Sequence, residues 1–189
     1  MVRLEASRRP ESRSRSSLVA HLFACMVLVA ATACESFTSG TYLNCPMVAF
    51  LGGTEHITQF KNGPGRSGID IAVEADMDNL DATCRFSTER VELELAFDIV
   101  AVRGLDSLAT GAEVPFFVAV IGAEGEVLAK TPFVARIPFL GAAPATWTED
   151  LMQEIVLAEG QHPRSFEVLI GFQLSAEQLD FNLARRGVR

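Results

Sequence analysis

The sequence predicts an all-β fold, a β-sandwich of about seven to nine strands that is followed by a short C-terminal α-helix. Apolar and polar residues alternate with a period of two over several segments, which is typical of strands that bury one face. Segments rich in glycine and proline separate these alternating segments at short intervals. An immunoglobulin-like sandwich fits this spacing, and an open barrel is the alternative.

Short strands and glycine-rich turns are expected in the first half of the domain. The loop KNGPGRSG carries three glycines and a proline, which interrupt regular structure. After it, Ile69 and every second residue through Met77 are apolar, so these residues should face the core. The expected elements are, in order, strands at 47–51 and 57–60, the loop at 61–68, a strand at 69–77, a turn at 78–82 and a short strand that points Cys84 and Phe86 inward.

Longer strands are expected in the second half. The strongest alternation covers residues 91–102, and residues 116–121 are almost wholly apolar, which predicts a central strand. Pro132 and Pro138 predict an edge strand or a bulge, because proline cannot donate a ladder hydrogen bond. The expected elements are a strand at 91–102, a loop at 104–111, a strand at 116–121, a hairpin turn at 122–125, a strand at 127–139, a loop at 141–145, a strand at 147–157, a turn at 160–164 and a strand at 166–174.

The periodicity changes at the C-terminus. Ser175 begins the tetrapeptide SAEQ, in which Ser175 can act as N-cap and Gln178 can complete a capping box. Leu179 and Leu183 are four residues apart and share one face of a helix. The sequence therefore predicts a short helix over residues 176–186.

Charge is divided unevenly along the chain. Residues 1–33 carry a net charge of +3, whereas the remainder has 11 basic and 22 acidic residues, a net charge of −11. A basic leader before an acidic body is typical of an exported protein. The shortage of Lys and Arg argues against a nucleic-acid partner and against electrostatic attraction to an anionic membrane.

Residues 1–33 have the pattern of a signal peptide. The apolar run LVAHLFACMVLVAATA at 18–33 matches a signal h-region in length and is shorter than the roughly 20 residues that a spanning helix needs. The run ends in ATA directly before Cys34. This junction resembles the lipobox of bacterial prolipoproteins, with alanine where that family usually has leucine.

The lipobox resemblance implies cleavage before Cys34, a diacylglycerol on its thiol and acylation of the new N-terminus. Several acyl chains on one residue give stable anchoring. Residues 34–44 would then be a lipidated tether, and residues 45–189 a single domain. Glu35 differs from the aspartate that retains lipoproteins in the inner membrane, so the resemblance implies a periplasm-facing anchor, with the outer membrane preferred and the inner membrane as the alternative. The alternative is ordinary cleavage after Ala33 that leaves Cys34 as a thiol.

This interpretation assigns a role or a loss to each of the four cysteines. Cys25 is lost with the leader and Cys34 takes the lipid. Cys45 and Cys84 remain, and in an oxidising compartment a disulfide between them is expected. The bridge would close a loop of about 40 residues, which the chain-entropy model values at roughly 4 kcal/mol. No Cys-x-x-Cys pair is present, so a zinc site is not predicted.

Residues 63–68 match the pattern G-x-G-x-x-G of dinucleotide-binding loops. That function requires a preceding strand and a helix that begins at the loop, so that helix N–H groups meet the pyrophosphate. Here a strand is expected after the loop, and Pro64 removes one N–H. We therefore expect a surface loop and no cofactor.

Four oxygen-bearing side chains, Asp76, Asp78, Asn79 and Asp81, lie within six residues. Calcium prefers such ligands, but the spacing does not fit an EF-hand loop. A solvated turn is the preferred interpretation, and a loose calcium site is the alternative.

Acidic residues also fill the outward faces of the strands expected at 69–77 and 91–102. If the two strands are neighbours, like charges face each other at some cost. A solvated face that discourages edge-to-edge pairing is the preferred interpretation, and a surface for a basic partner is the alternative. The residues concerned are Asp70, Glu74, Asp76, Glu92, Glu94 and Asp98.

No catalytic residue is predicted. His56 follows Glu55 and could act as a base, but neither Gly-x-Ser-x-Gly nor His-Glu-x-x-His is present. His56 and His162 are therefore expected to be ordinary surface residues. Trp147 is the single tryptophan, and we expect it in the core.

These observations favour a non-enzymatic envelope protein that docks another envelope protein near the membrane through a sheet edge or the acidic face. A module for a small molecule or a cation is the second hypothesis. A hydrolase whose serine, histidine and carboxylate meet only on folding is the third.

Overall fold

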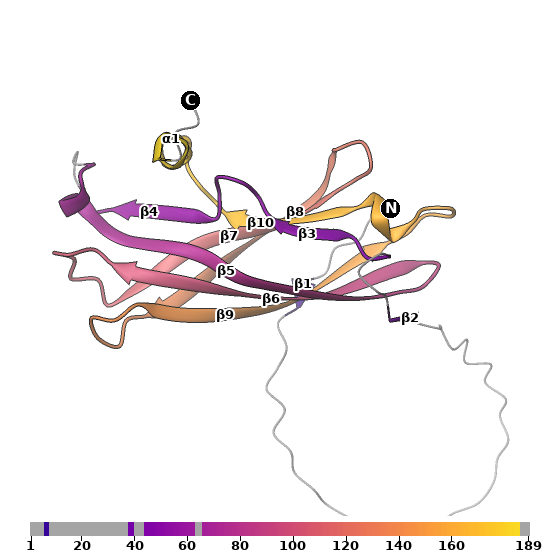
Figure 1. Ribbon diagram of the computed structural model, residues 1–189, viewed down its shortest axis with the longest axis horizontal. Helices are drawn as coiled ribbons and strands as arrows, with labels where there is room; N and C mark the ends of the chain where they lie inside the picture. Colours follow the sequence, from indigo (N-terminus) through magenta and orange to yellow (C-terminus); the bar gives the residue numbers. More distant parts are fainter. Residues whose placement is uncertain (1–5, 8–37, 40–43, 63–65, 186–189) are drawn as a thin grey trace, which may run out of the picture.

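The computed structural model describes residues 6–7, 38–39, 44–62 and 66–185, and two β-sheets face each other in it (Figure 1). The elements are β1 (Ala6–Ser7), β2 (Thr38–Ser39), β3 (Met47–Phe50), β4 (His56–Phe60), the 3-10 turn Gly68–Asp70, β5 (Ile71–Phe86), β6 (Arg90–Arg103), β7 (Gly111–Ile121), β8 (Val127–Pro138), β9 (Ala145–Val156), the 3-10 turn Pro163–Ser165, β10 (Glu167–Phe172) and α1 (Ala176–Arg185).

The predicted β-sandwich is confirmed. The first sheet has the order β9-β6-β5, with β4 and β2 paired to β5 and β1 paired to β9, and the second sheet has the order β3-β10-β7-β8. All neighbours are antiparallel except β3 and β10, which are parallel. The expected cleavage site and Cys34 lie outside the described residues, as do residues 63–65 of the glycine-rich loop.

The core lies between the inward faces of the two sheets. Period-2 alternation in β6 buries Val91, Leu93, Leu95 and Phe97 along with the following alternate residues. The Phe97 ring meets Phe116 of β7 edge to face, with centroids 5.6 Å apart. Each such buried side chain contributes about 1.5–3 kcal/mol relative to exposure, so the inward faces of β6 and β7 contribute strongly to the stability of the sandwich.

The predicted disulfide between Cys45 and Cys84 is confirmed. The Cα atoms of the two residues lie 6.0 Å apart. Cys45 precedes β3 of the second sheet, and Cys84 lies in β5 of the first sheet. The bridge therefore joins the two sheets at one end of the sandwich.

The predicted capping box and C-terminal helix are also confirmed. The Gln178 N–H donates to Ser175 Oγ at 3.2 Å, and the Ser175 N–H donates to Gln178 Oε1 at 2.9 Å. The described part of α1 ends at Arg185. Figure 1 shows α1 beside β4, at an edge of the first sheet.

The turn expected at 78–82 was wrong, because β5 continues through these residues. The register between β5 and β6 shifts between Asp78 and Asp81, which marks a β-bulge. Asn79 occupies the bulge with a φ of +52°. Asparagine adopts this left-handed conformation readily, so the same residues that indicate a turn also suit a bulge.

The inward position expected for Ile69 was wrong as well. Ser67 and Asp70 form a capping box around the 3-10 turn, and the Ser67 N–H donates to Asp70 Oδ2 at 2.9 Å. This turn places Ile69 outside the strand, where 64% of it is exposed. The hairpin turn at Gly125, with a φ of +80°, and the edge position of β8 are as expected.

Candidate docking face

Nine carboxylates share the outward face of the first sheet, which we call the acidic face. Period-2 alternation in β5, β6 and β9 sends these residues away from the core. Arg85 and Arg90 are the cations of the same strands that lie near them, with nitrogen–oxygen distances of 3.2–3.8 Å to Glu92 and Glu94. The acidic face comprises Glu74, Asp76, Asp78, Asp81, Glu92, Glu94, Asp98, Asp150 and Glu154.

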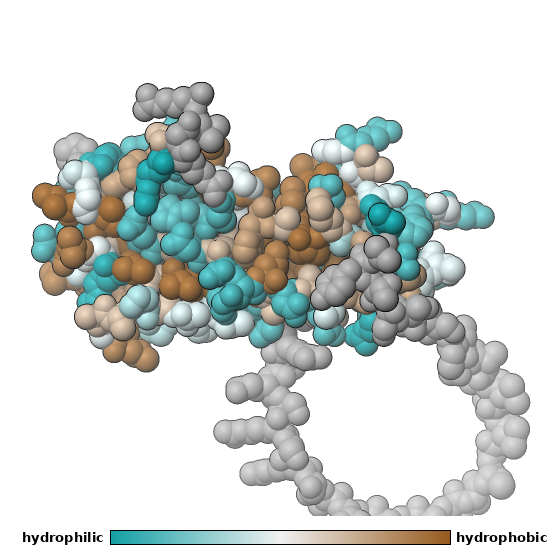
Figure 2. Space-filling model, viewed as in Figure 1, coloured by the Kyte–Doolittle hydropathy of each residue, from teal (hydrophilic) through white to brown (hydrophobic). Residues whose placement is uncertain are grey.

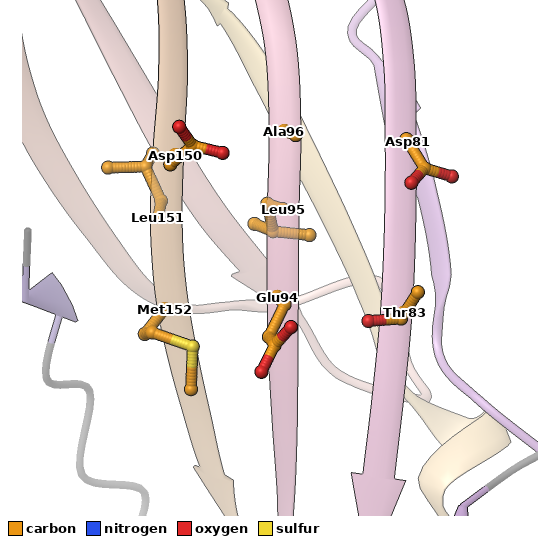
Figure 3. Close-up of a pocket in the computed structure, with 8 residues that line it drawn as sticks. All are labelled: Asp81, Thr83, Glu94, Leu95, Ala96, Asp150, Leu151 and Met152. Atoms are coloured by element: carbon orange, nitrogen blue, oxygen red, sulfur yellow. The ribbon is translucent and has the colours of Figure 1, made fainter. Parts of the chain in front are cut away.

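A shallow hollow of about 160 Å³ lies at the centre of the acidic face (Figure 3). Ala96 forms its floor, because alanine is small and its register partners carry longer side chains. Those partners are Asp81 of β5 and Asp150 of β9, one on each side of Ala96. Glu94 and Met152 also line the hollow, so three carboxylates surround a small apolar surface.

The acidic strands are neighbours, and Asp78 lies directly opposite Asp98 in the register. The Asn79 bulge relieves this like-charge pair, because its Nδ2 donates to Asp98 Oδ2 at 2.8 Å. Thr148 of β9 donates through its hydroxyl to Asp98 Oδ1 at 2.6 Å. The hydrogen bonds from Thr148 and Asn79 hold the pKa of Asp98 below its ordinary value.

His56 joins the acidic face to α1. Its Nδ1 lies 2.7 Å from Asp76 Oδ1, and its Nε2 lies 3.1 Å from Thr58 Oγ1. Arg185 lies 3.3 Å from the same Nε2 and donates to Glu74 at 2.9 Å. No sequence pattern indicates the contact between His56 and Arg185, because the two residues are 129 positions apart.

Thr58, His56 and Asp76 follow one another in the order of a nucleophile, a base and a carboxylate. The Thr58 side chain is not accessible to a substrate, however, because only 1% of the residue is exposed. The guanidinium of Arg185 also occupies the position next to Nε2. The arrangement therefore acts as a structural clasp between β4, β5 and α1.

The other singled-out residues lie apart from the acidic face. His162 is exposed and caps a 3-10 turn, where it accepts a hydrogen bond from the Arg164 N–H at 3.2 Å. The expectation that Trp147 is a core residue was wrong, since 37% of it is exposed. Trp147 lies two residues from the end of the ladder between β6 and β9, and its Nε1 donates to the buried Glu149 at 3.0 Å.

A larger cavity, of about 620 Å³, lies beside the disulfide. Val48, Leu80 and Leu93 give it apolar walls, and Arg164 and Glu167 give it polar ones. It lies between the ends of β3 and β5, away from His56. The sequence could not reveal this cavity because it depends on the bulge in β5 and on the packing of two sheets.

Two findings about metal binding and membrane spans concern the part of the chain that the structure describes. Within it, no three or more His, Cys, Asp or Glu side chains are grouped as metal ligands. Asp76, Asp78 and Asp81 point outward from a strand and its bulge. Among the same residues, no helix is long and apolar enough to cross a membrane.

Comparison with protein-family models, with curated proteins and with solved structures gave no match to this chain.

Proposed function

We propose that this protein is a lipid-anchored docking protein of the bacterial envelope, which holds a basic partner protein on its acidic face. The lipobox-like junction at Cys34 supports the anchor, because it follows a signal-type leader. The acidic face carries the docking proposal. Nine carboxylates on one side of a sheet create a negative potential that attracts and orients a cationic surface.

The sheet edges are poorer contact surfaces than the acidic face. Edge strand β8 contains Pro132, which cannot donate a ladder hydrogen bond. Strand β9, which pairs with the two residues of β1 at Met152 and Gln153, buries Glu149 and Gln153 on its inner side, and inward polar residues discourage pairing with a further strand. The edge at β4 is covered by α1. These features favour a partner that contacts side chains of this protein over a partner that adds a strand to one of its sheet edges.

The composition of the hollow also supports a protein partner. Asp81, Glu94 and Asp150 surround Ala96 and Met152, so the hollow can receive the aliphatic stem and the charged head of an arginine or lysine. Several such contacts would fix the register of the partner, since electrostatic complementarity gives specificity and a high association rate.

The first experiment is the intact mass of the protein purified from its native membrane. We expect a mass that begins at Cys34 with added acyl groups. A chain that begins at Cys34 without acyl groups would contradict the anchor and leave the docking proposal to be tested on a secreted protein.

The second experiment is photo-crosslinking in native membranes with p-benzoylphenylalanine at Met152. We expect one discrete crosslinked protein, with a yield that falls as the salt concentration rises, because salt screens exposed charges. The variant Asp81→Asn/Glu94→Gln/Asp150→Asn should reduce the yield about tenfold.

The matched control neutralises three exposed carboxylates away from the acidic face, in Glu124→Gln/Glu159→Gln/Asp180→Asn. This variant has the same net charge as the first and should keep the crosslink. Equal losses in both variants would show that only net charge matters, and an insensitivity to both would contradict docking on the acidic face.

The cavity beside the disulfide favours a second candidate function, binding of a small molecule. Its volume of about 620 Å³ lies in the range of ligand pockets. The exposed Arg164 at its wall suits a carboxylate or phosphate group. A thermal-shift screen with small organic acids tests this candidate, and it predicts a rise in Tm that Arg164→Gln abolishes.

A further inference from the structure

Four large aliphatic side chains on three loops are mostly exposed to solvent. Leu105, Leu108 and Leu140 are 93%, 94% and 96% exposed, and Ile69 is 64% exposed. Single exposed leucines are ordinary, but several large apolar side chains together at one place mark an interaction site. We call these four residues the apolar loop end.

Backbone and side-chain contacts hold the three loops together at one end of the sandwich. The Gly104 N–H donates to the Ala72 carbonyl at 3.0 Å, which ties the loop of Leu105 to the start of β5. Arg103 donates to the Gly141 carbonyl and lies over the Phe139 ring, which ties the loop of Leu140 to the end of β6. The three loops lie at the left end of Figure 1, and hydrophobic residues are visible at this end in Figure 2.

Gly104 shows that this arrangement is built into the fold. A Cβ at position 104 would lie 2.0 Å from the Ile71 carbonyl oxygen, so only glycine permits the close approach of the two loops. The Ile69 carbonyl is likewise fixed, because Lys61 Nζ donates to it at 2.7 Å. Close packing and hydrogen bonds therefore fix the backbone of the loops that carry these exposed side chains.

The tether enters the domain at the opposite end. Thr38 and Ser39 pair with Phe86 and Arg85 at the far end of β5, and the disulfide joins Cys45 to Cys84 there. The 14 residues of β6 run between the two ends and span about 45 Å at roughly 3.3 Å per residue.

This distance separates the apolar loop end from the anchoring membrane. Four residues lead from Thr38 back to Cys34, and they span at most about 14 Å. A lipid on Cys34 therefore holds the tether end of the domain near the bilayer and directs the apolar loop end away from it. The net charge of −11 after the leader disfavours a second, anionic membrane as the occupant.

We infer that the apolar loop end is the hydrophobic anchor of the docking surface, and that it inserts into apolar pockets on the same basic partner protein. This inference rests on the proposed function. The acidic face reaches the loops through the outward-facing Val102 of β6, which is 41% exposed and pairs with Glu74. A protein interface typically combines a few apolar anchors with a polar surround, and this surface offers both.

The test is photo-crosslinking of the full-length protein in its native membrane, with p-benzoylphenylalanine at Leu105 or Leu140. Glu124 and Glu159, exposed at the opposite end, are the control positions. We expect Leu105 and Leu140 to capture the protein that Met152 captures, and the control positions to capture nothing specific. Because Leu108 is almost wholly exposed, Leu108→Ser should fold normally and lower the yield at Leu140 about tenfold.

The outcomes separate this inference from the proposed function. A crosslink at Met152 without one at Leu105 or Leu140 would overturn the inference and leave the acidic face as the docking surface. No discrete crosslink at any of the three positions would overturn both.

A membrane contact has its own readout, because Trp147 is the only tryptophan and lies at the same end. The lipidated protein is reconstituted into vesicles of phosphatidylethanolamine and phosphatidylglycerol, with a fraction of the acyl chains brominated. We expect the Trp147 emission to match that in unbrominated vesicles. Quenching by the brominated chains would overturn the assignment to a protein partner.

Discussion

The side-chain amide of Asn182 donates to the backbone carbonyl of His56 at 2.6 Å, and through this contact α1 covers the open edge of β4. Asn182 Nδ2 also lies 3.1 Å from the Gly53 carbonyl, and one turn earlier Gln178 Nε2 donates to the Thr58 carbonyl at 3.1 Å. The spacing of residues 178 and 182 on a helix matches that of alternate carbonyls along a strand. The helix thus replaces a missing neighbouring strand with two amide side chains.

The first prediction concerns this helix-to-edge contact. Asn182→Leu should lower the free energy of unfolding by about 1–3 kcal/mol, because the carbonyls of His56 and Gly53 lose their donor in a buried position. Urea denaturation measures the change. Asp180→Asn, on the exposed side of the same helix, should stay within about 0.5 kcal/mol of the wild type. Equally small changes in the free energy of unfolding of both variants would show that the Asn182 hydrogen bonds do not stabilise the fold and that α1 contributes only its apolar contacts.

Much of the fold could be predicted from sequence, because the strands bury one face and alternate strictly. The alternation in residues 91–102 predicted β6 almost to its bounds, and the SAEQ tetrapeptide predicted the helix start. The errors fell where one residue type serves two structures. Asn79 suits a turn and a bulge equally, and Ile69 continues the alternation although a 3-10 turn removes it from the sheet.

The candidate site was predictable only in part. The sequence identified the acidic residues of single strands, but which of them face each other depends on strand order and register. Asp150 and Asp81 flank Ala96 from opposite sides only because β9 pairs with β6. The apolar loop end could not be predicted at all, since Ile69 and Leu140 are far in sequence from Leu105 and Leu108, and only exposure distinguishes these residues from core residues.

The second prediction concerns the disulfide. Cys45→Ser/Cys84→Ser should lower the free energy of unfolding by about 2–4 kcal/mol, because the open chain gains conformational entropy in the unfolded state. Urea denaturation with and without reductant provides the comparison. Reductant should destabilise the wild type to the level of the double variant and should leave the double variant unchanged. An effect of reductant on the double variant would contradict this account.

The third prediction concerns the pKa of Asp98. Thr148→Val should raise this pKa toward the ordinary aspartate value, because the variant lacks the hydroxyl that donates to the carboxylate. An NMR titration of the Asp98 side-chain carboxyl carbon measures the shift. Thr146→Val, two residues away on the same outward face, is the control and should leave the pKa of Asp98 unchanged. A wild-type pKa at or above the ordinary value would contradict the prediction.

The sign of the associated stability change follows from the direction of the shift. A carboxylate whose pKa is lower in the folded state stabilises the fold at pH values above its unfolded pKa. That contribution is lost as the pH falls through the ordinary aspartate range to the lower folded pKa. The wild type should therefore lose stability over this acid range more steeply than Thr148→Val, in urea denaturation at a series of pH values.

The fourth prediction separates stability from docking on the acidic face. Asp78→Asn should raise the free energy of unfolding by about 0.5 kcal/mol, because it removes the like-charge pair with Asp98. The amide oxygen of the new side chain can still accept the Asn79 N–H that Asp78 Oδ1 accepts at 2.8 Å. The same variant should weaken the crosslink from Met152, since the partner loses one carboxylate.

The opposite direction of the two effects distinguishes a docking face from a merely solvated one. A residue that is kept for the fold alone should not gain stability when it is neutralised, whereas a functional residue commonly does. Glu124→Gln, in the hairpin between β7 and β8, should change neither the stability nor the crosslink. If Asp78→Asn is more stable and captures the partner as well as the wild type does, then the negative charge at Asp78 is not used in docking, and the contact must lie nearer to the hollow around Ala96.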